Sequence, residues 1–531
     1  MVEPIDEDDE SQYPSKSKLV FIILGLDLAL FLVGLDNTII SSAIPKITDH
    51  FHALNDVGWY ASAYLLTICS TQLMWEKLYT FYSVKWVFLA SLFIFELGSL
   101  VCGVAPTSTA LIVGRAVAGI GGGGVGTGCF LLIAYSVPRR RRPTFVGMMG
   151  AMYRFAAIAG SLLGGAFTEN ASMTWRWCFY INLPWGVIPA TIIIFFIQTP
   201  KAQTASTVSF VDQLKQMDPL GTITLLPGVI CLLLALQWGG STYAWHNGRI
   251  IAPLVLTGVF LIAFVFIQIR GGDQATIPMR VFHNRNIWGS ALFGAGVEAC
   301  FYVMLYYLPI WFQAIKGASA IHSGVMNLPM IISFVIASVS GGILTSLVGY
   351  DVPFTYLTVI FMSVSTGLLS TLEADSGHAK WIGYQVILGL GVRFGLQSAF
   401  APCQTVLSLS DVTLGTSIIM FSENLGGAIM ESVATNVFTN QLVRNIAREV
   451  PSMDPETVVN AGATDLANQV PKTLYHAVIV AYNQAVTHTF YVGVAMACLS
   501  VLGAAVLEWV YIKGIRQRRM TVVLDDRQLT V

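Results

Sequence analysis

Charge is what this 531-residue sequence has least of: Asp, Glu, Lys and Arg together make up 11% of it, against 55% hydrophobic residues. Soluble globular proteins carry about 25% charged residues. The shortage therefore argues against a soluble fold. The net charge is −1 and no region is strongly basic. We accordingly expect no nucleic-acid partner.

Signatures of catalysis and of metal binding are also missing. The eight Cys show no CxxC spacing, and five of them lie in apolar runs, where we expect small hydrophobes rather than ligands: Cys69, Cys102, Cys129, Cys231 and Cys300. No zinc-type His/Glu spacing or nucleophile elbow is present. The stretch "GGGGVGTG" lacks the Lys of a nucleotide-binding loop. We predict neither an enzyme nor an ATP-driven pump, and no cofactor or metal.

Apolar runs, in contrast, recur from end to end, each long enough to cross about 30 Å of hydrocarbon as a helix. Barrel strands would need strict alternation, which is absent. We predict an all-α polytopic membrane protein with fourteen spans, over residues 19–41, 57–75, 86–105, 110–136, 144–168, 178–198, 219–239, 249–269, 287–313, 324–348, 353–372, 381–402, 411–438 and 489–512.

The distribution of Lys and Arg orients these spans. If the N-terminus is cytosolic, most of the 29 Lys and Arg fall in cytosolic loops and tails, as the positive-inside rule requires. The acidic start "MVEPIDEDDESQYPSKSK" is unlike a cleaved signal peptide. We therefore predict that both termini are cytosolic. On the outer side, Asp454–Pro455 favours a short helix, and Asn170 begins an Asn-Ala-Ser glycosylation acceptor.

Several ionisable residues nevertheless lie within the predicted spans. A charge in hydrocarbon is costly and usually faces a partner or a wet cavity. Acids and arginines occur in spans one, four, nine, twelve and thirteen, together with nearby polar residues: Asp36, Arg115, Glu298 and Tyr302, Arg393 and Gln397, and Glu423. They predict a polar, water-accessible interior. The structural alternatives are that Arg115 is a clamp and that Asp36 simply pairs with an arginine.

Several stretches resemble the fourteen-span drug:proton antiporters of the major facilitator superfamily, and in particular fungal toxin and multidrug efflux pumps. The matching stretches include "GLDNTIISSAIPKITDHF", "LIVGRAVAGIGGGG", "AGSLLGGAFTENASMTWRWCFYINLPWG" and "GTSIIMFSENLGGAI". Each motif is moderately specific, and their order at these spacings covers essentially the whole chain.

The resemblance implies two six-helix bundles around a midplane cavity, with two extra spans between them. The implied organisation is a cytosolic tail (1–18), a first bundle (19–198), a cytosolic linker (199–218), the extra spans (219–269), a cytosolic loop (270–286), a second bundle (287–512) with an external loop (439–488), and a cytosolic tail (513–531).

The same resemblance assigns roles to individual residues. Asp36 and Arg115 match the motif acid and arginine thought to couple proton movement, and Gly160, Gly164 and Gly165 match the antiporter glycines. Glu298, Tyr302, Arg393, Gln397 and Glu423 are our candidates for the cavity and substrate contacts.

Several residues depart from the pattern. Ser161 replaces the proline of the antiporter motif, which weakens the inference of antiport direction. Glu76 occupies a position where the superfamily usually has glycine, in the loop that gates the cytosolic face. Arg154, Arg393 and Glu423 also stand where small or neutral residues are expected, which could mark a charged substrate.

The favoured hypothesis is a proton-coupled exporter of a small amphipathic compound such as a toxin, secondary metabolite or drug. It would act by alternating access in the plasma membrane, as a monomer, with the vacuolar membrane as the alternative location. Within transport, the runner-up is a proton-coupled carrier of a nutrient such as a basic amino acid or an iron chelate. A non-transporting membrane sensor is the third hypothesis.

Overall fold

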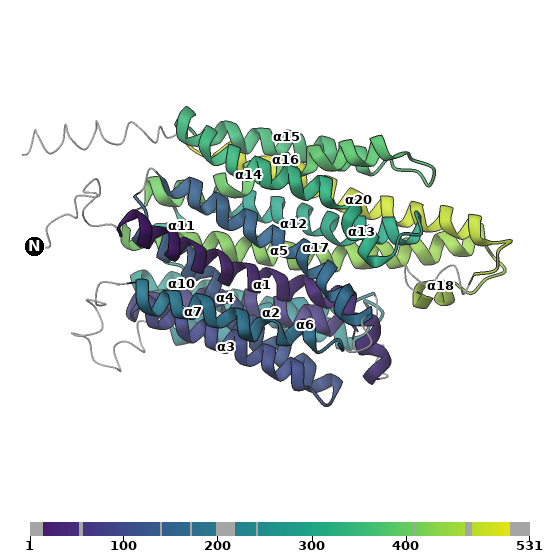
Figure 1. Ribbon diagram of the computed structural model, residues 1–531, viewed down its shortest axis with the longest axis horizontal. Helices are drawn as coiled ribbons and strands as arrows, with labels where there is room; N and C mark the ends of the chain where they lie inside the picture. The colour runs from purple at the N-terminus through teal and green to yellow at the C-terminus, as the bar shows by residue number, and fades with distance from the viewer. Residues whose placement is uncertain are drawn as a thin grey trace, which may run out of the picture.

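A computed structural model describes residues 14–51, 57–138, 141–169, 173–197, 218–240, 243–407, 409–461 and 470–509. Their secondary structure is helical, with no β-strand among these residues. The helices run roughly along the long axis of the molecule (Figure 1). They are α1 (Lys16–Phe51), α2 (Val57–Phe81), α3 (Val84–Val104), α4 (Ser108–Ser136), α5 (Arg142–Glu169), α6 (Trp177–Tyr180), α7 (Asn182–Phe196), α9 (Pro219–Trp238), α10 (Gly248–Gly271), the 3₁₀-helix η4 (Gly272–Gln274), α11 (Met279–Phe282), α12 (Arg285–Ala314), α13 (Ala320–Met326), α14 (Leu328–Val348), α15 (Val352–Leu369), α16 (His378–Val406), α17 (Leu409–Glu449), α18 (Pro455–Ala461) and α20 (Tyr475–Val506).

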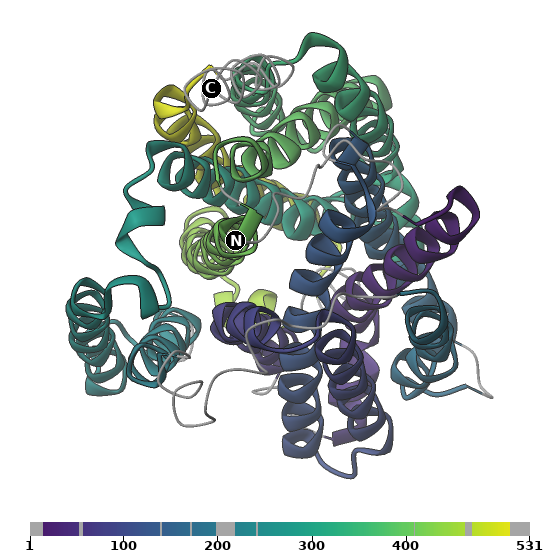
Figure 2. The ribbon, with the colours of Figure 1, turned by 90° about the vertical axis from the view of Figure 1, so that its left-hand side faces the viewer.

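The helices form two bundles seen end-on in Figure 2, one built from α1–α7 and the other from α12–α20. The bundles meet mainly where α5 packs on α14 and where α2 packs on α17. The pair α9–α10 stands at the side of the molecule (Figure 2), with α9 packed on both α2 and α17. The extra pair therefore covers one of the two seams between the bundles.

Close packing within the first bundle depends on glycine. A Cβ at Gly98 of α3 would collide with the backbone of Ala118 in α4, and one at Gly121 of α4 would collide with the backbone of Phe95. Small residues allow such approach between helices in lipid. Large apolar side chains on the outside, such as Phe195 and Ile262, are each 74% exposed, as expected of a surface that faces lipid.

Nine helical stretches in the described part of the chain are long and apolar enough to cross a membrane. Every one of the fourteen predicted ranges overlaps a helix. The total of fourteen spans remains a prediction, because only those nine meet the length and hydropathy that a span requires.

The helices that contain the last two predicted spans are longer than those spans. The final helix begins at Tyr475 rather than near 489, and α17 continues to Glu449, so residues at both ends of the predicted 439–488 loop are helical. Polar residues such as Asn483 and Gln484 interrupt the apolar pattern between 475 and 489. Hydropathy alone therefore does not show that the final helix begins at Tyr475. The short helix expected after Asp454 is present as α18.

Asp218 attaches the extra pair at the predicted cytosolic face. It has a left-handed backbone (φ 47°), and its side chain caps α9 by accepting from the Gly221 amide at 2.9 Å. Its other carboxylate oxygen accepts from Gln268 Nε2 (2.7 Å) and from both the amide and the hydroxyl of Thr276 (2.8 Å each). Burial raises the pKa of Asp218, but these hydrogen bonds outweigh it and the pKa is lowered overall.

The neighbouring residues connect this attachment to both bundles. Lys77 of α2 donates to the Ala275 carbonyl at 2.8 Å. Arg280 of α11 donates to both carboxylate oxygens of Asp411 on α17, at 2.6 and 2.9 Å. Glu76, the unusual acid in this region, is buried and accepts from the Thr80 hydroxyl at 3.0 Å. Asp218, Gln268, Thr276 and Arg280 thus connect the extra pair to both bundles at the predicted cytosolic face, and we refer to this set of residues as the cytosolic clasp.

Candidate functional site

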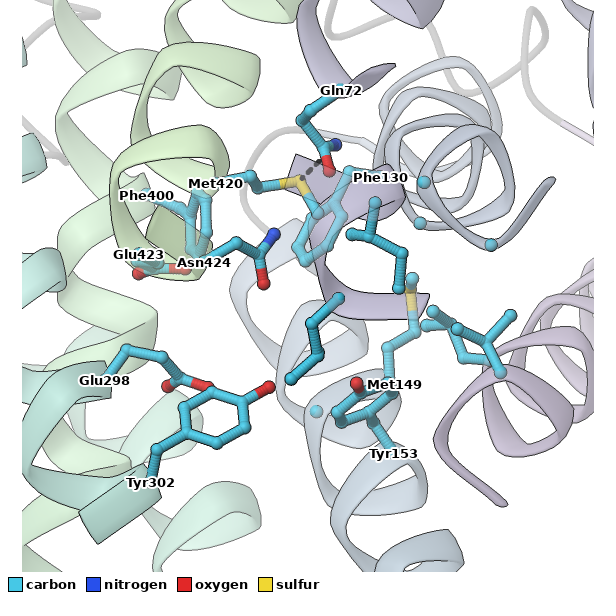
Figure 3. A pocket seen from close by; sticks show the side chains of 18 residues that line it. Gln72, Phe130, Met149, Tyr153, Glu298, Tyr302, Phe400, Met420, Glu423 and Asn424 are labelled. Atoms are coloured by element: carbon cyan, nitrogen blue, oxygen red, sulfur yellow. Dashed lines mark hydrogen bonds between the residues drawn. The ribbon is translucent and has the colours of Figure 1, made fainter. Parts of the chain in front are cut away.

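A cavity of about 140 Å³ lies between the two bundles and is partly open to solvent. The first bundle contributes walls from α1, α2, α4 and α5, and the second from α12, α16 and α17 (Figure 3). Its lining residues are Leu30, Val33, Leu65, Ile68, Gln72, Gly122, Gly123, Gly126, Phe130, Met149, Gly150, Tyr153, Glu298, Tyr302, Phe400, Met420, Glu423 and Asn424. The surface is mostly apolar and aromatic, with a few polar groups, as in many small-molecule sites.

Glycine in α4 and α5 makes room for this space. Gly122, Gly123 and Gly126 present backbone rather than side chains to the cavity, and Gly150 does the same from α5. Across from them, the Met420 side chain reaches within 3.5 Å of where a Cβ at Gly126 would stand. Larger residues at these positions would close the cavity from the side of the first bundle.

Three of the predicted cavity residues come together here. Glu298 and Tyr302 are one turn apart on α12, Glu423 projects from α17, and all three line the cavity while remaining at most 8% exposed. A Cβ at Gly294 would lie 2.8 Å from Oε1 of Glu423, and one at Gly427 would lie 2.6 Å from the Tyr302 ring. These two glycines let the carboxylate and the ring fit between α12 and α17.

The other predicted residues fall partly outside the described structure. Arg393 and Gln397 lie on α16, and the cavity residue Phe400 follows Arg393 by two turns, but the side chains of Arg393 and Gln397 are not among those described. The side chain of Arg154 on α5 is likewise not described, and Asn170 lies outside the described residues.

Asp36 and Arg115 form a buried ion pair within the first bundle, with Nη1 of Arg115 2.5 Å from Oδ2 of Asp36. Both side chains are 0% exposed. Arg115 Nε also donates to the Tyr60 carbonyl at 2.8 Å, and Asn182 Nδ2 of α7 donates to the second Asp36 oxygen at 3.0 Å. The carboxylate is therefore satisfied by a charge and an amide in a water-excluded setting.

This arrangement corrects the expectation that Asp36 and Arg115 line a wet passage. Neither is among the described residues that line the cavity. The Tyr64 ring separates them from it: the Arg115 guanidinium stacks 4.3 Å from the ring centroid, and the Tyr64 hydroxyl donates to the carbonyl of the cavity residue Val33 at 3.1 Å. The structural alternative, pairing of Asp36 with an arginine, is the arrangement observed.

The antiporter-motif glycines lie on α5 where it packs along α1. A Cβ at Gly160 would collide with the Thr38 hydroxyl and lie 2.9 Å from the Ile39 amide. Gly164 and Gly165 are buried one turn further on, and their carbonyls accept from the Thr168 hydroxyl at 2.8 and 3.0 Å. Ser161 does not prevent α5 from running as one helix from Arg142 to Glu169.

Sequence reasoning missed Gln72, Tyr153 and Asn424 as cavity residues, and Tyr64 and Asn182 as partners of the ion pair. Gln72 donates to Thr127 at 2.5 Å and lies 3.9 Å from the sulfur of Met420 in the other bundle. A lone amide inside the apolar run of α2 was the available signal for it. Asn182 sits in the quoted "WRWCFYINLP" run and could have been noticed there.

Comparison with known proteins places this geometry in context. A family model described as "Major Facilitator Superfamily" matches residues 26–430. The chain is 50% identical over 511 residues to "MFS-type efflux pump MFS1" of Arthroderma benhamiae, covering 96% of this chain and 95% of that protein. It is 49% identical over 507 residues to "Efflux pump roqT" of Penicillium rubens (96% and 93% covered) and 47% identical over 517 residues to "Efflux pump aflT" of Aspergillus parasiticus (97% and 100%).

Solved structures agree in fold at low sequence identity. The proton:xylose symporter XylE aligns with a TM-score of 0.59 at 14% identity, covering 92% of this chain and 95% of that one. The human organic anion transporter MFSD10 aligns with a TM-score of 0.58 at 12% identity, covering 92% and 99%. At such identities the likeness extends to the fold alone.

Proposed function

Because the chain belongs to the Major Facilitator Superfamily, and is therefore a multi-pass membrane transporter rather than an enzyme, we propose that it exports a small amphipathic organic compound in exchange for protons. The outward direction is supported by relatives named as efflux pumps, which match nearly the whole chain. The compound belongs to the class of toxins, secondary metabolites or drugs.

The central cavity is the observation that carries the proposal. It lies between two bundles and draws its walls from both, so a change in the angle between the bundles would expose it to one side and then the other. Its aromatic and aliphatic walls suit an apolar body, and Gln72, Asn424 and the carboxylates offer hydrogen bonds to polar groups.

Glu298 and Glu423 are the carboxylates that we propose bind the exchanged proton. They line the space that the compound enters, so the compound and the proton can compete for the same oxygens. Asp36 is a weaker candidate than the motif resemblance implies. The Arg115 guanidinium keeps its charge and pairs with Asp36, so in this proposal the ion pair opens before Asp36 takes up a proton.

Alternating access requires the bundles to separate at each end in turn. The tight contact of Gly160 with α1 lets α5 move with the first bundle as one unit while its other side slides on α14. We propose that the proton gradient is the sole energy source, that the protein works as a monomer in the plasma membrane, and that both termini are cytosolic.

Transport into sealed inside-out vesicles tests the proposal. The vesicles carry the purified protein and an imposed inward-acid gradient, and a panel of amphiphilic dyes, polyketides, basic amino acids and iron chelates is screened. We expect gradient-dependent uptake of at least one amphiphile, abolished by a protonophore. Uptake of amino acids or chelates alone would favour the nutrient carrier, and no gradient-dependent flux of any compound would contradict the proposal.

A further inference from the structure

A buried acid lies outside the central cavity, at the seam between α3 and α7 of the first bundle. Both carboxyl oxygens of Glu96 are shielded from solvent, and neither has a hydrogen-bond partner among the described residues. The carboxyl group lies against α7, because a Cβ at Gly186 would collide with its Oε1. Glu96 is not one of the described residues that line the cavity, so proton exchange in the cavity gives this acid no role.

The seam borders the surface that faces lipid. On α3, Phe93 and Leu97 are 68% and 43% exposed and lie beside Glu96 on the outer face of the helix. On α7, Trp185 and Val187 are exposed as well. The Glu96 carboxyl group is therefore covered by two helices at the edge of the hydrocarbon layer, where water is not available to solvate a charge.

These surroundings indicate that Glu96 carries a proton. An ionised carboxylate in an apolar setting is costly unless a cation or hydrogen-bond donors compensate it, and an uncompensated acid takes up a proton instead. Asp36 also lies close enough to interact electrostatically with Glu96. Its negative charge makes a second anion at this seam still less favourable.

Asn182 of α7 links Glu96 to the buried ion pair. Its Nδ2 donates to Oδ1 of Asp36 at 3.0 Å and to Oγ of Ser99 at 3.1 Å, which uses both amide hydrogens and fixes the orientation of the amide. Its own Oδ1 is buried and has no partner in the described part of the chain. Ser99 follows Glu96 by one turn of α3, and Gly186 follows Asn182 by one turn of α7. The acceptor without a donor and the acid without a partner thus lie along the same seam.

Arg115 is the cation that both acids face. The groups that interact electrostatically with Asp36 from the helices around it are Arg115 on α4, Tyr64 on α2, Cys102 on α3 and Cys178 on α6. Among these four, Arg115 alone carries a positive charge at neutral pH. An ionised Glu96 would therefore compete with Asp36 for the same guanidinium.

We propose that Glu96 is a further proton-binding site of the transporter, filled in this conformation, and that Asn182 links its occupancy to the Asp36–Arg115 pair. Its role in transport rests on the proposed proton-driven export, whereas proton binding itself does not. The carboxyl O–H supplies the donor that Asn182 Oδ1 lacks, directly or through one water molecule.

Release of the proton changes the balance of charge in the first bundle. The O–H bond of Glu96 breaks, the proton passes to water when the bundles rearrange, and no other covalent bond changes. A second anion then remains beside Asp36 and competes for Arg115, which weakens the ion pair. The bundle is therefore tightest with the site filled and loosens when it empties.

Carbodiimide labelling tests proton occupancy without any measurement of transport. Dicyclohexylcarbodiimide is apolar, enters lipid and adds to a protonated carboxyl group, whereas a carboxylate does not react. The full-length protein is reconstituted in vesicles and treated at a series of pH values, and labelled residues are identified by peptide mass spectrometry. We expect the labelling rate of Glu96 at about pH 7 to stay within about twofold of its rate at about pH 5.5, whereas an ordinary glutamate would react about thirtyfold more slowly at the higher pH.

Two variants separate proton binding from packing. Glu96→Gln keeps the shape and offers an N–H to Asn182 but cannot release a proton, so its yield should stay near wild type while gradient-driven transport falls about tenfold. Gly186→Ala places a Cβ where Oε1 lies and displaces the acid from α7, so it should also slow transport. The matched control is Leu97→Ala, the next residue on the lipid-facing side of α3, which should change neither labelling nor transport.

The outcomes separate this inference from the proposed function. If Glu96 reacts as expected but wild type moves no amphiphile, the export function is wrong and the proton site stands. Labelling that falls about thirtyfold toward neutral pH would show an ordinary carboxylate and overturn the inference. If Glu96 stays unmodified at every pH, the infrared difference between wild type and Glu96→Gln decides: a protonated-carboxyl band at neutral pH supports the site, and its absence overturns it. A Glu96→Gln variant with the transport rate and pH dependence of wild type would overturn the link to transport.

Discussion

The Asp36–Arg115 pair and the Glu298–Glu423 pair of carboxylates both lie among apolar helices, but their surroundings differ. Asp36 is held by a guanidinium and an amide inside one bundle, behind the Tyr64 ring. Glu298 and Glu423 come from α12 and α17 and face the space shared by both bundles. From this difference we propose that the first pair maintains the shape of a bundle and that the second pair contacts the transported compound.

Removal of one partner of the buried pair should have the largest effect. Arg115→Ala leaves the Asp36 carboxylate uncompensated in a dry site, which we expect to cost roughly 3–5 kcal/mol of stability. The measurement is the yield and thermal inactivation of detergent-purified protein. The double variant Asp36→Asn with Arg115→Gln should recover part of the loss. Equal stability of Arg115→Ala and wild type would contradict a structural role for the pair.

Neutralising a cavity carboxylate should instead spare folding and affect transport. Glu423→Gln keeps the shape that Gly294 accommodates, so yield and stability should stay near wild type. Transport driven by the pH gradient should fall about tenfold or more, because a group that exchanges protons has been removed. Asn424→Asp adds a carboxylate one residue away in the same cavity lining. It therefore serves as the control in which the charge of the cavity changes in the opposite direction. A Glu423→Gln variant with unchanged pH dependence would remove Glu423 from the coupling mechanism.

A third comparison involves Asp218 of the cytosolic clasp, whose carboxylate lies at the predicted cytosolic face rather than within a helix bundle. Asp218→Ala removes a charged acceptor that binds Gly221, Gln268 and Thr276, and we expect a loss of about 2–3 kcal/mol. Because the pKa of Asp218 is lowered in the fold, its contribution should be constant from pH 6 to 8 and be lost only as the pH falls below the ordinary range of an aspartate. Thermal inactivation across this pH range tests both statements; a wild-type advantage that already disappears at pH 6 would refute the second.

Asp351 should show the opposite pH dependence and the smallest effect. It precedes α15 without capping it, and burial raises its pKa to about 7. The folded state then binds more protons than the unfolded state between pH 4 and 7, so stability should fall as the pH rises through that window. The pKa difference alone corresponds to about 4 kcal/mol, and because Asp351 is only partly buried we expect a loss of about 1–2 kcal/mol. Asp351→Asn should remove this loss and inactivate more slowly than wild type at pH 8. A variant that is less stable than wild type at pH 8 would disprove this.

Much of the fold could be predicted from the sequence because apolar runs of membrane-spanning length are hard to mistake. Glu298, Tyr302 and Glu423 were placed correctly in a shared cavity, since polar residues at helical spacing in hydrocarbon point inward. The dry setting of Asp36 could not be predicted. It depends on Tyr64 and Asn182, which come from two other helices, and nothing in the local pattern around Asp36 reveals them.

The extension of α17 and α20 beyond the predicted spans has a related cause. Hydropathy reports where a chain meets lipid, but a helix can continue into water when its polar groups pair with a neighbour. Asn445 of α17 donates to the Ala481 carbonyl of α20 at 3.2 Å, and Trp311 donates to Asn483 at 2.7 Å. Such pairings between distant segments maintain helical structure where composition alone suggests a loop.

The length of α17 has a practical consequence. Its 41 residues extend over about 61 Å, twice the thickness of the hydrocarbon layer, and its C-terminal end, near α18, projects together with α20 beyond the other long helices (Figure 1). The same continuous helix carries Glu423. A nanobody that binds around Arg444 and Arg448 would therefore bind a rigid element that also forms part of the cavity wall. Such a reagent could trap single conformers for imaging and report their interconversion from the predicted outer side of the membrane.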